Sequence, residues 1–106
     1  MVKSNLAGYS FSIHTANKLW GTAMNAFDNT RSCGGSSGGD GGLVGARCVP
    51  FGIGTDTIGS IKIPASFNGT RGFRPTGYRT SNNNSYLHPD LHRSFNPIPG
   101  VLGPLA

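Results

Sequence analysis

Acidic residues are scarce in this sequence, which has no glutamate and only four aspartates against nine lysines and arginines, for a net charge of +5. The basic residues are scattered and form neither a run nor a helical stripe. Nucleic-acid-binding domains usually gather lysine and arginine on one face. We therefore predict that nucleic acid is not a partner of this chain.

Cysteine is also rare, with two residues, Cys33 and Cys48. Their spacing matches no zinc motif, and two cysteines cannot build a disulfide-rich scaffold. Reduced thiols in an intracellular protein are therefore expected. No histidine motif accompanies Cys33, so we interpret both cysteines as packing residues rather than as nucleophiles.

The sequence has no apolar run long enough for a signal peptide or a membrane-spanning helix. Membrane association would have to come from segments outside these residues. Hydrophobic residues make up 36% of the 106 residues, alongside 17 glycines and 7 prolines. This composition leaves little material for an independent core, so we expect the chain to be part of a larger domain.

Glycine is concentrated in one stretch that also contains Ser36 and Ser37. Six glycines lie there, at positions 34, 35, 38, 39, 41 and 42. Such a backbone can adopt positive φ and bring N–H groups close to an anion or an oxyanion. The same composition is typical of a flexible linker. The apolar residues that follow at 43–49 favour a loop inside a folded core.

Short elements are expected around this loop. Alternation over residues 9–13 predicts a strand, residues 28–30 predict a turn, and residues 51–54 predict a buried strand that runs into a turn. Several large apolar side chains are expected in strands or in the core: Trp20, Phe27, Ile61, Ile63, Phe67 and Phe73.

Histidines give a weak signal. His88 and His92 are four positions apart and would face each other on a helix, but Pro89 disfavours a regular helix and no third ligand is near. We therefore predict no metal site. His14 lacks a paired acid or nucleophile motif and is interpreted as a structural or surface residue.

Three known glycine-containing motifs give little or no signal in this sequence. Residues 34–38 satisfy the G-x-S-x-G pattern of a nucleophile elbow, but the preceding residues 29–33 are polar and do not predict the required apolar strand. Neither GxxxxGK[ST] nor GxGxxG is present. We therefore predict neither a nucleotide site nor any other cofactor.

A more specific signal comes from two segments taken together. Residues 34–39, GGSSGG, followed by residues 54–64, GTDTIGSIKIP, resemble the signature of the amidase signature family, and most closely its fatty acid amide hydrolase branch. The spacing between Ser36 and Ser60 agrees with that signature. Residues 19–25, 67–77 and 99–106 resemble neighbouring family blocks, so the resemblance covers nearly the whole chain.

The resemblance implies an α/β fold with a mixed central sheet flanked by helices, of which residues 1–106 would form a part. The signature core would span residues 32–77, and a polar loop at 80–86 interrupts the resemblance. The family's loop feeds a helix whose N-terminus points toward the active site, which predicts a short helix over residues 40–47 that ends before Pro50.

The resemblance also implies roles for individual residues. Ser60 would be the nucleophile and Ser36 a bridging serine that passes the proton to a lysine. The oxyanion hole would consist of backbone N–H groups of Thr57, Ile58, Gly59 and Ser60. The loop would be supported by Gly34, Gly35, Ser37, Gly38 and Gly39. The expected substrate is a small-molecule or lipid amide, cleaved through an acyl-enzyme on Ser60.

Three positions depart from the family pattern. The family's lysine lies farther ahead of Ser36 than the first residue of this chain, so neither Lys3 nor Lys18 is assigned as the base. Ile58 stands where the family has glycine and would be strained by about 1–3 kcal/mol if its φ were positive. Lys62 replaces the usual arginine and removes a planar donor fork.

These departures leave a second hypothesis open. A truncated or degenerate family member without catalysis, unfolded or serving only as an interaction segment, would show no serine reactivity and little cooperative unfolding.

Overall fold

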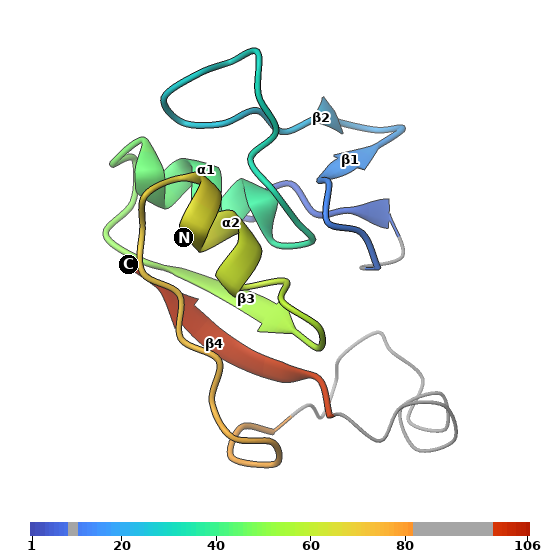
Figure 1. Cartoon of the computed structure of the whole chain (residues 1–106), viewed down its shortest axis with the longest axis vertical. Helices are drawn as coiled ribbons and strands as arrows, with labels where there is room; N and C mark the ends of the chain where they lie inside the picture. The colour runs from blue at the N-terminus through green and yellow to red at the C-terminus, as the bar shows by residue number, and fades with distance from the viewer. Residues whose placement is uncertain (9–10, 82–98) are drawn as a thin grey trace.

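The fold is built from two short helices and two small antiparallel sheets (Figure 1). The structure, a computed structural model, describes residues 1–8, 11–81 and 99–106. Its elements in chain order are β1 (Ala16–Asn17), β2 (Gly21–Thr22), α1 (Gly38–Gly45), β3 (Gly52–Asp56), α2 (Lys62–Phe67) and β4 (Val101–Leu105).

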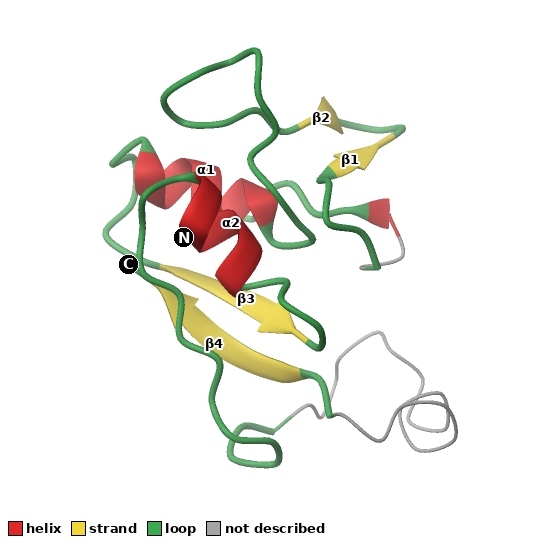
Figure 2. Ribbon diagram, in the orientation of Figure 1, coloured by secondary structure: helices red, strands yellow, loops and turns green. Residues whose placement is uncertain are grey.

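The longer sheet pairs β3 with β4, which is distant in the sequence. The strands are antiparallel, and their register places Gly52 opposite Leu105 and Asp56 opposite Val101. Both helices lie over one face of this sheet (Figure 2). The core between these layers consists of Val44, Ile61, Ala65 and Leu105, with Val49 packed against it.

Helix α1 exists despite its glycines, each of which disfavours a helix by about 1 kcal/mol relative to alanine. Close packing against α2 explains why glycine is needed. A Cβ atom at Gly41 would lie 2.8 Å from the Cβ of Pro64, and one at Gly45 would lie 2.8 Å from the backbone oxygen of Asn68. Larger residues would push the two helices apart.

Three local predictions are confirmed in place. The helix predicted over residues 40–47 is present as α1, which begins two residues earlier and ends before Pro50. The strand predicted over residues 51–54 is present as β3, which continues to Asp56, but the predicted burial is wrong, because Phe51 and Ile53 are 59% and 55% exposed. At the predicted turn, the Asp28 carboxylate accepts a hydrogen bond from the Thr30 N–H at 2.9 Å.

The strand predicted over residues 9–13 is wrong for the part that the structure describes. Phe11 and Ile13 lie in an exposed loop without ladder bonds, whereas residues 9 and 10 lie outside the described ranges. Alternation predicts a strand only where another strand is available to pair with it.

The large apolar residues expected in strands or in the core differ in burial. Ile61 is fully buried in the core, as predicted, although it precedes α2 instead of lying in a strand. The prediction is wrong for Trp20 and Phe27, which are 73% and 74% exposed, and for Phe67 and Phe73, which are exposed as well. The described residues leave more than half of each of these four residues uncovered.

Two further sequence predictions lie outside the described ranges. The polar loop over residues 80–86 is described only at Thr80 and Ser81. The histidines at positions 88 and 92 fall entirely within residues 82–98. In the part of the chain that is described, no helix is long and apolar enough to cross a membrane.

Asn68 connects three segments from a fully buried position. Its Nδ2 group donates to the backbone oxygens of Cys33 and Pro64, each at 2.8 Å. Its Oδ1 atom accepts a hydrogen bond from the Ala26 N–H at 2.9 Å. One side chain therefore ties the glycine loop and the preceding loop to the end of α2.

We expect the substitution Asn68→Ala to lower the free energy of unfolding of the full chain by at least about 2 kcal/mol. The reason is that each buried backbone group left unpaired costs about 1–3 kcal/mol. Chemical denaturation measures the change. Asn29→Ala is the control, because Asn29 is exposed, and its effect should stay within about 0.5 kcal/mol. Equal effects of the two substitutions would contradict this role of Asn68.

The two cysteines occupy different environments. Cys33 is fully buried, as predicted for a packing residue, whereas Cys48 is exposed, and the prediction that it packs is wrong. Burial raises the pKa of the Cys33 thiol, and a weaker contribution from a hydrogen bond with Thr15 opposes the rise. Cys33 is thus a poor nucleophile at neutral pH, because the thiolate is the reactive form.

Alkylation with iodoacetamide at pH 7.5 should modify Cys48 at least about tenfold faster than Cys33, because a raised pKa and burial both lower thiolate reactivity. Mass spectrometry of the digested chain measures both rates. Denaturant should bring the rates together, since unfolding removes the burial. Equal rates in the native chain would show that Cys33 is not protected as described.

Candidate active site

The glycine-rich loop is buried and held in place rather than free. Ser36 and Ser37 are fully buried. The hydroxyl of Thr15 lies 2.8 Å from the oxygen of Gly34 and 3.1 Å from that of Ser36, and it accepts a hydrogen bond from the Gly38 N–H at 3.0 Å. One buried hydroxyl thereby fixes the backbone on both sides of Ser36. The linker interpretation does not describe this loop.

Glycines allow this loop to pack so tightly. Gly34 has a φ of +79°, a conformation that favours glycine. A Cβ atom at Gly35 would lie 2.7 Å from the oxygen of Ser12, and one at Gly38 would overlap both Cys33 Sγ and Thr15 Oγ1. These positions explain why the sequence concentrates glycine around the two serines.

Ser37 joins this loop to the second signature segment. Its N–H donates to the backbone oxygen of Ser60 at 3.2 Å. Its Oγ atom accepts a hydrogen bond from the Thr55 N–H at 3.0 Å and lies 3.3 Å from the Thr55 oxygen. The two signature segments, separate in the sequence, are therefore adjacent in space.

The hydroxyl of Ser36 has no hydrogen-bond partner among the described residues, although it is fully buried. No other buried side-chain oxygen or nitrogen in the described ranges has this property. Buried hydroxyl groups in folded proteins are nearly always paired, and an unpaired one points to a partner or a functional role. Ser60, in the adjacent segment, is 8% exposed.

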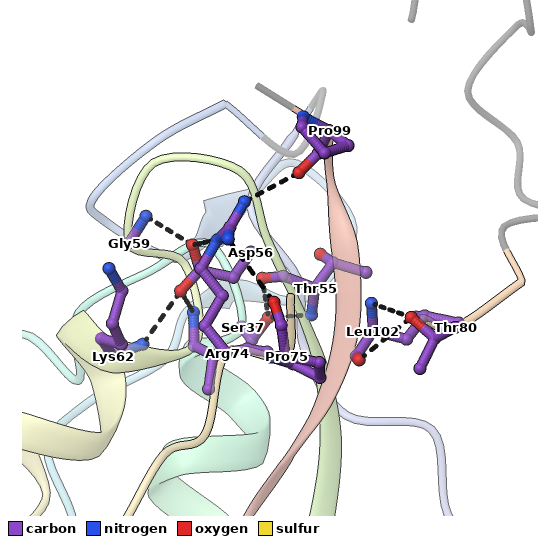
Figure 3. A network of polar contacts seen from close by, with 11 residues as sticks. Ser37, Thr55, Asp56, Gly59, Lys62, Arg74, Pro75, Thr80, Pro99 and Leu102 are labelled. Carbon is purple, nitrogen blue, oxygen red and sulfur yellow. Dashed lines mark hydrogen bonds and ion pairs between the residues drawn. The ribbon is translucent and has the colours of Figure 1, made fainter. Parts of the chain in front are cut away.

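The turn before Ser60 is organised by the carboxylate of Asp56, which is fully buried (Figure 3). Its Oδ1 atom accepts a hydrogen bond from the Gly59 N–H at 2.8 Å. Its Oδ2 atom accepts from the N–H groups of Ile61 at 3.1 Å and Lys62 at 3.4 Å. The carboxylate thus closes the turn and satisfies N–H groups at the start of α2, which would otherwise be unpaired.

The positive charge beside this carboxylate comes from Arg74. Its Nε atom lies 3.3 Å from Asp56 Oδ1, and its side chain is only 22% exposed. Its Nη2 group donates to the backbone oxygen of Pro99 at 2.8 Å (Figure 3). In the sequence, Arg74 is one of several scattered basic residues, and no sequence pattern pairs it with Asp56.

The structure places the predicted oxyanion residues on this turn. The Gly59 N–H points to Asp56, and Gly59 has a φ of +129°. Ile58 is not among the residues with positive φ, so the strain expected at this position is absent. Its side chain is 67% exposed. The oxyanion role of Thr57, Ile58 and Gly59 stays a prediction.

The side chains of the other candidate residues are exposed. Lys3, Lys18 and Lys62 are exposed. His14 is exposed too, and its Nδ1 atom lies 2.9 Å from the hydroxyl of Ser32. In the described ranges, no group of three histidine, cysteine or acidic side chains is placed to hold a metal ion.

Comparison with known proteins identifies the family. The family model described as Amidase matches residues 1–106. Fatty acid amide hydrolase 1 of Caenorhabditis elegans is 47% identical over 77 residues, which cover 73% of this chain and 14% of that protein. Indoleacetamide hydrolase of Pseudomonas savastanoi is 47% identical over 79 residues, or 74% of this chain and 17% of that protein.

Solved structures agree with the sequence comparison. A structure of 6-aminohexanoate cyclic dimer hydrolase is 33% identical, with a TM-score of 0.88, and the match covers 100% of this chain and 21% of that one. A structure titled fatty acid amide hydrolase has a TM-score of 0.82 at 35% identity, covering 92% and 16%. The chain thus spans 14% to 21% of the length of these matched proteins, and it has part of their α/β fold. It belongs to the amidase signature family and is similar to its fatty acid amide hydrolase branch.

Proposed function

We propose that these residues form the serine centre of an amidase, with Ser60 as the nucleophile and Ser36 as the residue that relays its proton. The observation that carries the proposal is the hydroxyl of Ser36, buried without a partner in a loop that is hydrogen-bonded to the backbone of Ser60. A hydroxyl in that position can accept a proton from one side and pass another to a base on the other side.

The proposed reaction begins when the Ser60 oxygen attacks the amide carbonyl carbon. The Ser60 proton moves to Ser36, whose own proton moves to a neutral lysine, and charge develops on the former carbonyl oxygen. The C–N bond then breaks, the leaving nitrogen takes the proton from the lysine through Ser36, and an ester to Ser60 remains. Water then attacks this ester while its proton moves through Ser36 to the neutral lysine, and the proton returns to the Ser60 oxygen as the carboxylic acid leaves.

The lysine of this relay is proposed to come from a segment outside residues 1–106. A lysine acts as a base only when burial lowers its pKa enough to keep it neutral. Lys3, Lys18 and Lys62 are exposed and do not meet this condition. A buried partner for the unpaired Ser36 hydroxyl is what such a lysine would supply.

The proposed substrate is a linear carboxamide with an apolar acyl group. Relatives named fatty acid amide hydrolase and indoleacetamide hydrolase carry amides in their names. The exposed Ile58 side chain, two residues before Ser60, offers apolar surface to an acyl chain. This chemistry requires neither a metal nor an organic cofactor.

A second proposal is a non-catalytic interaction segment. It is favoured by the exposed aromatic side chains of Trp20, Phe27, Phe67 and Phe73, which are suited to burial against another protein surface. Reaction at Ser60 distinguishes the two proposals, since an interaction segment has no need of a reactive serine.

In a protein that joins residues 1–106 to the segment supplying the lysine, Ser60→Ala should abolish covalent labelling by a fluorophosphonate, because this reagent reacts with activated serine hydroxyls and the nucleophilic oxygen is removed. Mass spectrometry of the labelled peptide locates the modification. Ser66→Ala is the matched control, since Ser66 is an exposed serine on α2, and it should label at the wild-type rate. Absence of label at Ser60 in that protein would refute the catalytic proposal.

Ser36→Ala should slow the reaction at Ser60 while leaving the stability of the fold nearly unchanged. Removal of the relay should slow labelling of Ser60 by at least about 100-fold, in the range typical of lost general acid–base catalysis. The free energy of unfolding should change by less than about 1 kcal/mol, because no described residue loses a hydrogen bond to that hydroxyl. Labelling at the wild-type rate, with the alanine variant folded, would exclude the relay.

A further inference from the structure

The buried carboxylate of Asp56 needs a compensating charge. An ionised carboxylate without water or a partner is costly to bury, and removing one partner of such a pair destabilises the site strongly. Within the described ranges, Arg74 alone forms an ion pair with Asp56. Lys62 contacts the same carboxylate only through its backbone N–H, and its side chain is exposed.

Backbone hydrogen bonds of residues 71–73 to β4 and to Ala106 place Arg74 beside Asp56. The N–H of Arg71 donates to the oxygen of Ala106 at 2.6 Å, and the N–H of Ala106 donates back at 2.8 Å. The Phe73 N–H donates to the oxygen of Pro104 at 3.0 Å. Gly103 permits this approach, since a Cβ atom there would overlap the oxygen of Phe73.

The guanidinium then connects two elements at once. One edge faces Asp56, at the end of β3, while Nη2 binds the oxygen of Pro99, just before β4. Asp56 and Val101 are opposite each other in the strand register, so this contact lies where the two strands begin to separate. An ammonium group has no planar fork and cannot reproduce both directions of donation.

We propose that Arg74 is a positioning residue for the turn that carries Ser60. It holds the Asp56 carboxylate, and the carboxylate in turn holds the N–H groups of Gly59, Ile61 and Lys62 on either side of the serine. Arg74 thus supplies a planar donor fork beside this turn, although position 62 carries lysine. The inference rests on the proposed function of Ser60 for its catalytic consequence.

The test compares Arg74→Gln and Arg74→Lys in the same lysine-containing protein as the Ser60 test. Arg74→Gln should lower the rate constant of fluorophosphonate labelling at Ser60 and the kcat for a carboxamide by at least about tenfold. A misplaced Ser60 raises the activation free energy, and a rise of about 1.4 kcal/mol corresponds to a factor of ten in rate. KM should change less than about threefold. Arg74→Lys should recover part of kcat, since it restores the charge but not the fork.

Arg71→Gln is the matched control. Arg71 is exposed and contacts β4 through backbone atoms alone, so labelling, kcat and stability should stay at wild-type values. The double variant Asp56→Asn with Arg74→Gln should label no more slowly than Asp56→Asn alone, because Arg74 acts through the carboxylate. Additive losses in this cycle would overturn the inference.

A readout independent of activity separates this inference from the proposed function. In folded Arg74→Gln chain, hydrogen exchange of residues 57–62, followed by mass spectrometry, should be at least about tenfold faster than in wild type, because the Gly59 N–H loses a fixed acceptor. Unchanged exchange and unchanged labelling overturn the positioning role while the serine proposal stands. Faster exchange in a chain whose wild type is never labelled leaves Arg74 holding the turn and removes the serine chemistry.

Discussion

The site depends on one buried negative charge. The Asp56 carboxylate is fully buried, and its desolvation is offset by three backbone N–H groups and the guanidinium of Arg74. These partners come from the turn after β3, the beginning of α2 and the segment that follows α2. Because a single side chain satisfies all of them, the end of a strand, a turn and the start of a helix share one geometry. Ser60 lies inside that turn, so the contacts of the carboxylate fix the position of its backbone.

A second constraint sets the distance between the turn and the glycine-rich loop. Thr15 fixes the loop from one side, and Ser37 binds both Thr55 and the backbone of Ser60 from the other. Both contacts require the glycine-rich loop and its neighbouring segments to lie very close together. At Gly54, for example, a Cβ atom would lie 2.8 Å from Ser37 Oγ. Glycine is thus used here for packing. The composition that is compatible with a linker in the sequence belongs, in the fold, to a buried and hydrogen-bonded segment.

Sequence analysis predicted the local elements near the motif better than the burial of the aromatic side chains. The β3 strand was predicted from the local apolar pattern, whereas the α1 helix and the adjacency of the two serine segments are what the family resemblance implied. Burial of Trp20 and Phe27 was predicted from side-chain chemistry alone, yet both are exposed. Apolar character favours burial only where a second surface is present, and this chain spans 14% to 22% of the first curated relatives it matches. The Asp56–Arg74 pair was missed for a different reason, since it depends on how residues after α2 pair with β4.

The lysine at position 62 leaves the turn before Ser60 intact. From the sequence, lysine at this position removes a planar donor, and a loss of function is the natural expectation. In the fold, the buried Asp56 carboxylate needs a cation beside it. Arg74 supplies that cation from a separate segment, anchored by its backbone neighbours to β4 and by Nη2 to Pro99. Lys62 is then free to remain exposed, because its backbone N–H is the only group of that residue that the carboxylate uses.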